Sequence, residues 1–133
     1  MQYDGIAAGF SGSQAQWRQT GVQTTDATVT DLVSIALAEG ESIILEAKIQ
    51  GFQSDFSDAI GSRVLASARR ATGGNVTLVG LPVIDILESD ASTNVTVLAD
   101  TVGQNLKIQV TGVAAQTWNW VSTHNYHKVL TNS

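Results

Sequence analysis

The two histidines of the chain, His124 and His127, are three residues apart, which is a spacing typical of a metal-binding pair. On a β-strand, however, residues three apart point to opposite faces, so these two cannot share a metal ion without a bulge. The chain also contains no Cys, which excludes thiolate ligands and disulfides. We therefore expect no metal site and no cofactor. The pair is interpreted as polar positions of a strand near a rim or a subunit contact.

The densest group of carboxylates consists of Asp85, Glu88 and Asp90. A glycoside hydrolase requires two carboxylates at a set separation across a cleft. On a strand, Asp85 and Glu88 fall on opposite faces, and Asp90 lies in a turn signal, so a solvated sheet end is the simpler interpretation. The sequence also lacks a nucleophile elbow, an ordered catalytic triad and glycine-rich nucleotide or phosphate loops. We therefore predict that the protein is not an enzyme.

Two tryptophans, Trp118 and Trp120, fall on one face of a strand near the C-terminus, together with Tyr126. One interpretation is core packing, since one face of a sandwich strand must be apolar. The alternative is an exposed platform on which a sugar ring stacks, which would make a host glycan a partner. We favour a division in which Trp120 lies in the core, while Trp118 and Tyr126 lie at a rim or subunit contact.

Composition limits the classes of partner. A chain of 133 residues corresponds to a single domain, and 43% of its residues are apolar, as in ordinary globular proteins. The net charge is −5, with seven basic and twelve acidic residues, so the basic patch that nucleic-acid binding needs is missing. No segment is as long and apolar as a membrane span, and the N-terminus does not resemble a signal peptide. We expect neither nucleic acid nor membrane as a partner.

From residue 27 onward, apolar and polar residues alternate with a period of two, which predicts half-buried strands. Turn signals separate about seven such runs, including the stretches SIILEAKIQ and NLKIQV, with a break expected at residues 80–82 because Pro82 cannot donate to a ladder. The stretch 52–62 is left open between a loop and a short helix. This spacing predicts an all-β, antiparallel β-sandwich. Its predicted core residues are Ile43, Leu45, Ile49, Val95, Val97, Leu106, Ile108 and Trp120.

Residues 1–26 differ from the rest, because Gly, Ser, Gln and Thr dominate and no period persists. We interpret them as an extended N-terminal arm outside the sandwich, which then occupies residues 27–133. The arm carries Tyr3, Phe10 and Trp17 at seven-residue spacing, followed by Arg18. Such aromatic groups are suitable anchors on another chain, so these four residues are predicted to form a partner interface.

Two stretches of the sequence resemble a known class of protein. The first, LKIQVTGVAAQTWNWVSTHNYHKV (106–129), is similar to the closing hairpin of β-domains in tailed-bacteriophage structural proteins, with Trp120 at the Trp position and Trp118 at a variable apolar position. The second, ARRATGGNVTLVG (68–80), resembles a strand-turn-strand of the same domains. The resemblance covers roughly residues 25–129.

The resemblance implies a virion structural protein with a jelly-roll-like sandwich, commonly a homotrimer, in a family that does not itself carry catalysis. The chain contains no long repetitive shaft, which favours a capsid decoration or cement protein that binds the major capsid protein or another virion protein. It would then reside on the outer capsid surface, and in the host cytoplasm during assembly. Two alternatives stay open: a tail, collar or head-fibre component, and a carbohydrate-binding β-sandwich module.

Overall fold

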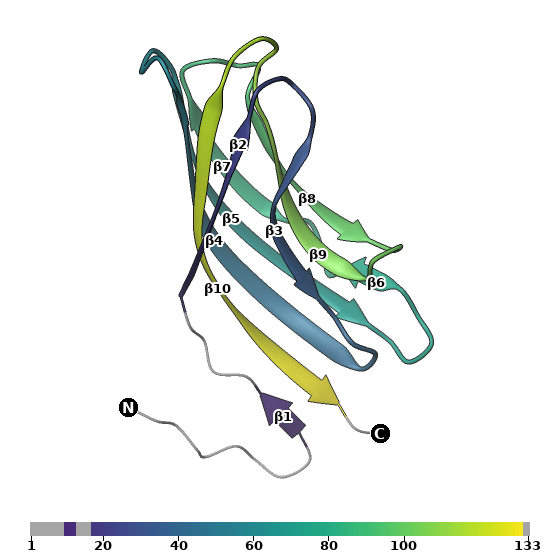
Figure 1. Cartoon of the computed structure of the whole chain (residues 1–133). Helices are drawn as coiled ribbons and strands as arrows, with labels where there is room; N and C mark the ends of the chain where they lie inside the picture. Colours follow the sequence, from purple (N-terminus) through teal and green to yellow (C-terminus); the bar gives the residue numbers. More distant parts are fainter. Residues whose placement is uncertain (1–9, 13–16, 132–133) are drawn as a thin grey trace.

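The computed structural model describes residues 10–12 and 17–131, which form ten strands and no helix (Figure 1). The prediction of an all-β, antiparallel sandwich is confirmed. Within the described residues there is accordingly no helix with the length and apolar character of a membrane span. The strands are β1 (Phe10–Gly12), β2 (Arg18–Thr24), β3 (Thr30–Ala36), β4 (Glu41–Gln53), β5 (Ala59–Arg70), β6 (Val76–Leu78), β7 (Val83–Glu88), β8 (Asn94–Asp100), β9 (Asn105–Thr111) and β10 (Trp118–Thr131).

The strands form two antiparallel sheets that pack face to face (Figure 1). The seven-stranded sheet has the order β1-β10-β4-β5-β6, in which β2 also pairs with β10 and β7 also pairs with β5. The three-stranded sheet has the order β3-β9-β8 and covers one face of the larger sheet. The C-terminal strand β10 therefore lies inside the large sheet, between β4 on one side and β1 and β2 on the other.

Alternation along the longest strands determines which side chains enter the sandwich. In β4, every second residue from Ile43 to Gln53 is buried, and the residues between them are exposed. The same alternation continues in β5 and in the first half of β10. The side chains from both sheets meet in one core, which includes the predicted residues Ile43, Leu45, Ile49, Val95, Leu106, Ile108 and Trp120, with Val97 partly buried against it.

Strand β3 departs from simple alternation. Its pairing with β9 shifts in register between Asp31 and Val33, as in a β-bulge. Both Leu32 and Val33 are buried as a result, although neighbouring residues of a regular strand point to opposite faces. The bulge lets a short strand contribute two consecutive side chains to the core.

Part of the segment that the composition assigns to an arm belongs to the large sheet. Strand β2 pairs along β10 from Arg18 opposite His124 to Thr24 opposite Trp118. Thr24 is buried, and its hydroxyl accepts a hydrogen bond from the indole N–H of Trp120 at 3.0 Å. Sheet pairing thus begins before the boundary at residue 27. The cause is that an edge strand with mostly exposed side chains does not show the apolar alternation that marks a half-buried strand.

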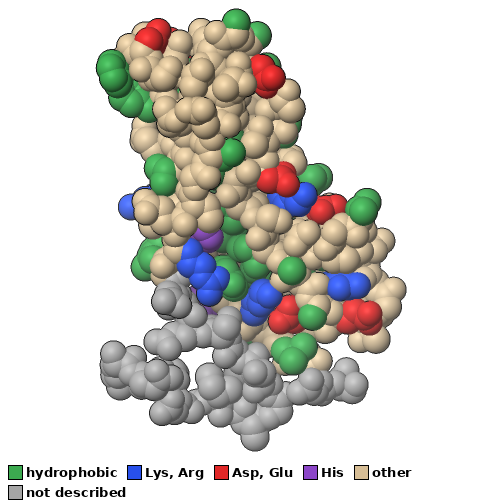
Figure 2. Space-filling view, viewed as in Figure 1, with side chains coloured by type: hydrophobic (Ala, Val, Ile, Leu, Met, Phe, Trp, Pro, Cys, Tyr) green, Lys and Arg blue, Asp and Glu red, His purple; other side chains and the backbone are tan. Residues whose placement is uncertain are grey.

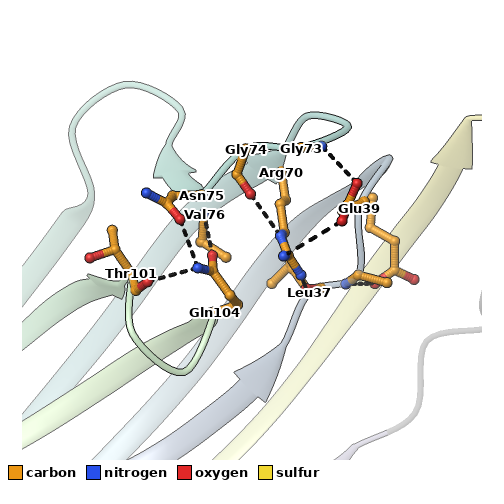
Figure 3. A network of polar contacts seen from close by, with 11 residues as sticks. Leu37, Glu39, Arg70, Gly73, Gly74, Asn75, Val76, Thr101 and Gln104 are labelled. Carbon is orange, nitrogen blue, oxygen red and sulfur yellow. Dashed lines mark hydrogen bonds and ion pairs between the residues drawn. The ribbon is translucent and has the colours of Figure 1, made fainter.

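Two polar side chains hold the loops together at one end of the sandwich (Figure 3). Arg70 donates to the carbonyl oxygens of Gly74, at 2.9 Å, and of Leu37, at 3.0 Å. The side-chain amide of Gln104 donates to Asn75 Oδ1 at 2.8 Å and accepts from the backbone N–H of Val76 at 2.8 Å. These bonds connect the loops after β3, β5 and β8, so this end is closed by specific contacts rather than open as a pocket.

Candidate functional site

The outer face of the small sheet carries a lysine that forms ion pairs with two carboxylates. Lys107 Nζ lies 2.9 Å from Asp31 Oδ2 and 3.3 Å from Asp100 Oδ2. Backbone N–H groups of Gly103 and Val102 donate to Asp100 and lower the pKa of its carboxyl to about 2. Figure 2 shows Lys and Arg side chains beside Asp and Glu on this face, with hydrophobic groups only in separate small patches. Each charged group of the cluster has a partner within it, so the cluster has a structural interpretation.

The outer face of the seven-stranded sheet differs, because no described element covers it and it exposes large apolar groups. Phe52, at the end of β4, is 44% exposed, and Phe56, in the turn between β4 and β5, is 77% exposed. Their ring centroids are 5.7 Å apart with an interplanar angle of 43°. Two adjacent aromatic rings in solvent are an unusual use of apolar surface, and they mark this end of the face as a candidate binding site.

The backbone that presents Phe56 is strained and well braced. Phe56 has a φ of 67°, a left-handed conformation that is costly for a bulky residue. The hydroxyl of Ser57 donates to Asp55 Oδ1 at 2.6 Å and lies 2.8 Å from Gln53 Oε1, and its bond to the carboxylate is the main cause of the lowered pKa of Asp55. The backbone N–H of Gln53 donates to the carbonyl of Asp58 at 2.9 Å. The turn therefore holds an exposed ring in a fixed position at a conformational cost.

Amide side chains surround the aromatic pair. Asn119 lies directly opposite Phe52 across the β10–β4 pairing, and Gln23 lies opposite Asn119 on β2. Gln23 Nε2 donates to Asn119 Oδ1 at 3.0 Å, which leaves the N–H groups of Asn119 available on the exposed face. Gln50 is the next outward residue along β4. The aromatic rings thus have hydrogen-bonding groups beside them.

A shallow groove continues from the amides toward the edge of the sheet. Its volume is about 480 Å³. The groove is open at Gly61 because glycine has no side chain. A Cβ placed there would meet only Gln50 Oε1, at 3.5 Å, so the space above the strand is open. Arg63 and Asp85 form an ion pair at 3.1 Å along its wall. The residues that line it are Lys48, Ile49, Gln50, Gly61, Ser62, Arg63, Asp85 and Leu87.

We call this surface the outer-face site and define it as Phe52, Phe56, Asn119 and the groove residues. The sequence pattern does not identify Phe52 and Phe56 as site residues, because residues 52–62 fit either a loop or a short helix. The available signal was the alternation of β4, which continues unbroken through Phe52 to Gln53. No sequence signal distinguishes the exposed amides from ordinary surface polarity.

The predicted tryptophan division is corrected in one respect. Trp120 is buried with 3% exposure, but Trp118, expected at a rim or partner contact, is also buried with 0% exposure. The two rings lie 5.7 Å apart in a stacked arrangement, and Gln116 Oε1 accepts a hydrogen bond from the Trp118 indole at 3.0 Å. The core accommodates both rings because Gly51 leaves space against Trp120. Neither ring is available as a sugar-stacking platform.

Three of the remaining predicted interface residues, Trp17, Arg18 and Tyr126, lie where β2 meets the far half of β10. Arg18 donates a hydrogen bond to the Tyr126 hydroxyl, and its guanidinium carbon lies 4.5 Å from the centre of the Tyr126 ring. Trp17 is 53% exposed beside them. Tyr3 lies outside the described residues, and for Phe10 the structure describes only the backbone pairing with Thr131. An interface role for this group stays a prediction.

The histidines and carboxylates lie as strand geometry predicts. His124 is buried and His127 is exposed, so the two point to opposite faces of β10. Asp85 lies on the outer face, whereas Glu88 accepts a hydrogen bond from the Thr93 hydroxyl at 3.2 Å. Asp90 caps the turn by accepting from the backbone N–H of Ser92 at 2.9 Å. The structure does not bring these groups together into one centre.

The similar solved structures include two phage tailspike proteins, both at low identity. No protein-family model and no curated protein matches the sequence significantly. A tailspike protein of Acinetobacter baumannii phage AM24 is 10% identical with a TM-score of 0.44, and the match covers 89% of this chain and 26% of that one. The tailspike protein gp49 of Acinetobacter baumannii bacteriophage Fri1, described as a capsular polysaccharide depolymerase, is 11% identical with a TM-score of 0.38; the match covers 96% of this chain and 22% of that one.

Both similar structures are phage virion proteins, as is the class that the sequence resemblance implies, and neither is a capsid decoration protein. The chain spans about a quarter of the length of each. The prediction that the protein is not an enzyme is contradicted by this comparison, because one of the two is described as a depolymerase. That prediction was based on absent motifs, and such motifs describe only the catalytic sites that have a local sequence signature.

Proposed function

We propose that this chain is a β-sandwich module of a phage tail-associated protein, and that it binds a host-surface carbohydrate through the outer-face site. The observation that carries the proposal is the exposed pair Phe52 and Phe56, held by a strained turn beside amide side chains. Residues with strained backbone conformations are concentrated at binding sites, where a side chain must be held in a fixed position. Folding alone gives no reason to place a phenyl ring there.

The chemistry of the site suits a sugar polymer. A pyranose ring has an apolar C–H face that packs on an aromatic ring, and its hydroxyls need donors and acceptors at the edge. Phe52 and Phe56 supply the rings, and Gln50 and Asn119 supply both donors and acceptors. The groove over Gly61 continues from Gln50, so a chain of several sugar units has a continuous path. The open shape suits a long polymer better than a small enclosed ligand.

Phe56→Asn is the variant that tests the site, because Asn tolerates positive φ and the change removes the ring without adding strain. We expect the variant to remain folded and to lose at least tenfold in affinity for fragments of a host capsular polysaccharide, measured by isothermal titration calorimetry. Leu98→Ala is the matched control, because Leu98 is 43% exposed on the small sheet. Equal binding by wild type and Phe56→Asn, or no binding of any polysaccharide, would refute the proposal.

The assignment to the tail needs a separate measurement. Antibody labelling of intact particles, viewed by electron microscopy, distinguishes the tail from the capsid surface. Label on the tail supports the proposal, and label confined to the capsid would favour the decoration role that the resemblance implies. The resemblance implies a homotrimer, and light scattering of the purified protein distinguishes that state from a monomer or a dimer.

A further inference from the structure

Strand β7 is an edge of the seven-stranded sheet with unpaired backbone groups. It pairs with β5, and no other described strand pairs with its second edge. Edge strands are usually protected by charged side chains, especially Lys, by Pro or by a bulge. Residues Val83–Glu88 contain no Lys, Pro or bulge, and their charged residues are Asp85 and Glu88. On the outer face, β7 exposes Val83 (52%) and Leu87 (81%) to solvent.

The sequence of β7 is nearly symmetric about its centre. Residues 83–87 read Val-Ile-Asp-Ile-Leu, which is a near palindrome around Asp85. When two antiparallel strands pair around a two-fold axis at one residue, positions equally far from that residue lie opposite each other. An axis at Asp85 therefore places Val83 opposite Leu87 of a second copy, and Ile84 opposite Ile86. Each of these pairs joins two apolar side chains on the same face of the combined sheet.

The backbone of β7 is oriented correctly for this pairing. The N–H of Ser89 donates to the carbonyl of Ala59 at 3.1 Å. Because antiparallel ladders alternate, Val83, Asp85 and Leu87 then direct their backbone groups toward β5, and Ile84 and Ile86 direct theirs toward the free edge. These two isoleucines are the residues that exchange hydrogen bonds in a pairing centred on Asp85. A pairing centred on Ile86 would instead place Ile84 opposite Glu88.

We propose that β7 pairs with β7 of a second copy of this chain, around a two-fold axis at Asp85. The two seven-stranded sheets then form one continuous sheet, with both outer faces on the same side. The two Asp85 carboxylates face each other, which weakens the pairing, although each keeps its own Arg63 partner at 3.1 Å. Because Asp85 and Leu87 also line the groove, the pairing joins two grooves end to end.

Cysteine cross-linking tests the register, since the chain contains no Cys of its own. Opposite residues in a pair without mutual hydrogen bonds have Cα atoms about 4.5 Å apart, which fits a disulfide. Asp85→Cys is expected to form a covalent dimer under mild oxidation. Leu87→Cys alone should not, because its two copies lie about 13 Å apart, whereas a mixture of Val83→Cys and Leu87→Cys should. Val102→Cys, at a position 94% exposed, reports random collision.

Sedimentation over a concentration series tests the uncross-linked protein, with circular dichroism to confirm that each variant folds. We expect a concentration-dependent dimer, about fourfold tighter in Asp85→Asn because two facing charges are removed. Leu87→Lys should shift the same concentration series to monomer. A monomer in both wild type and Asp85→Asn, a trimer, or cross-linking of Leu87→Cys as readily as Asp85→Cys would overturn the proposal.

Discussion

The two faces of the seven-stranded sheet are built from the same strands but are constrained in different ways. On the inner face, Gly51 of β4 lies where any side chain would collide with Trp120 and Ile60. On the outer face, Gly61 of β5 lies where added atoms meet open space. Packing therefore determines residue identity on the inner face. On the outer face packing determines little, so packing does not account for the exposed ring of Phe56 there.

The largest expected contrast between the faces comes from Trp120 and His127 of β10. Trp120 is buried, stacks on Trp118 and donates to the Thr24 hydroxyl at 3.0 Å, so Trp120→Ala should lower the free energy of unfolding by about 3–5 kcal/mol. His127 is exposed on the opposite face, and His127→Ala should change the free energy of unfolding by less than about 0.5 kcal/mol. Urea titrations of both variants measure the difference. Equal midpoints would contradict the burial of Trp120.

The two strand glycines sharpen the same contrast with identical substitutions. In Gly51→Ala the new Cβ would lie 2.7 Å from ring carbons of Trp120 and 2.8 Å from Ile60 Cγ2, and the overpacking should destabilise the protein by about 1–3 kcal/mol. In Gly61→Ala the nearest atom is 3.5 Å away, so the effect should be neutral or stabilising by up to about 1 kcal/mol. Thermal unfolding of the pair checks both signs. A destabilised Gly61→Ala would mean that the groove is filled.

The stability of the protein should depend on pH through the buried His124. Burial, with a smaller contribution from the Arg18 charge, lowers the pKa of His124 below its ordinary value of 6.5. The unfolded chain then binds a proton that the folded chain does not, so stability is complete above pH 6.5 and falls as the pH decreases from 6.5 toward the folded pKa. The slope reaches at most about 1.4 kcal/mol per pH unit.

Unfolding free energies measured between pH 5 and pH 7.5 test this dependence, because most carboxylates titrate below about pH 5. His124→Gln should flatten the curve. A curve that stays sloped in His124→Gln would assign the effect to another group.

The smallest expected effect belongs to the outer-face ion pair. Arg63 and Asp85 are 3.1 Å apart, but their side chains are 70% and 59% exposed, so solvent screens the attraction. A double-mutant cycle with Arg63→Ala and Asp85→Ala should give a coupling of less than about 1 kcal/mol at low salt, and less at high salt. A larger coupling that resists salt would indicate that another group covers this part of the face.

Much of the inner face follows from the sequence, because burial imposes a period of two on β4, β5, β9 and β10. The same period places His124 and His127 on opposite faces. The missing N–H of Pro82 explains why a strand ends before it. The bulge at Asp31 was not predictable, since two consecutive apolar residues also fit a helix or a continuous buried strand.

The edge strand β2 and the outer-face site were not predictable for a related reason. The side chains of β2 are mostly exposed, so polar residues give no periodic signal there. Phe56 can be recognised as a candidate binding residue only from its backbone conformation and its distance from Phe52. Neither property can be predicted from the sequence pattern. Exposed sites depend on which surfaces remain uncovered, which is a property of the finished fold.

The position of β10 has a consequence for synthesis on the ribosome. Of the ten described strands, β10 leaves the exit tunnel last, and it pairs with β4 along thirteen consecutive residues and also holds β1 and β2 in the sheet. Until then, β4 presents an unpaired edge, and the indole rings that complete the core are missing from the nascent chain. Domains dominated by such distant pairings form slowly and expose aggregation-prone edges meanwhile. The sandwich can therefore close only after β10 has left the exit tunnel, and truncation within β10 should yield chains that associate with chaperones instead of folding.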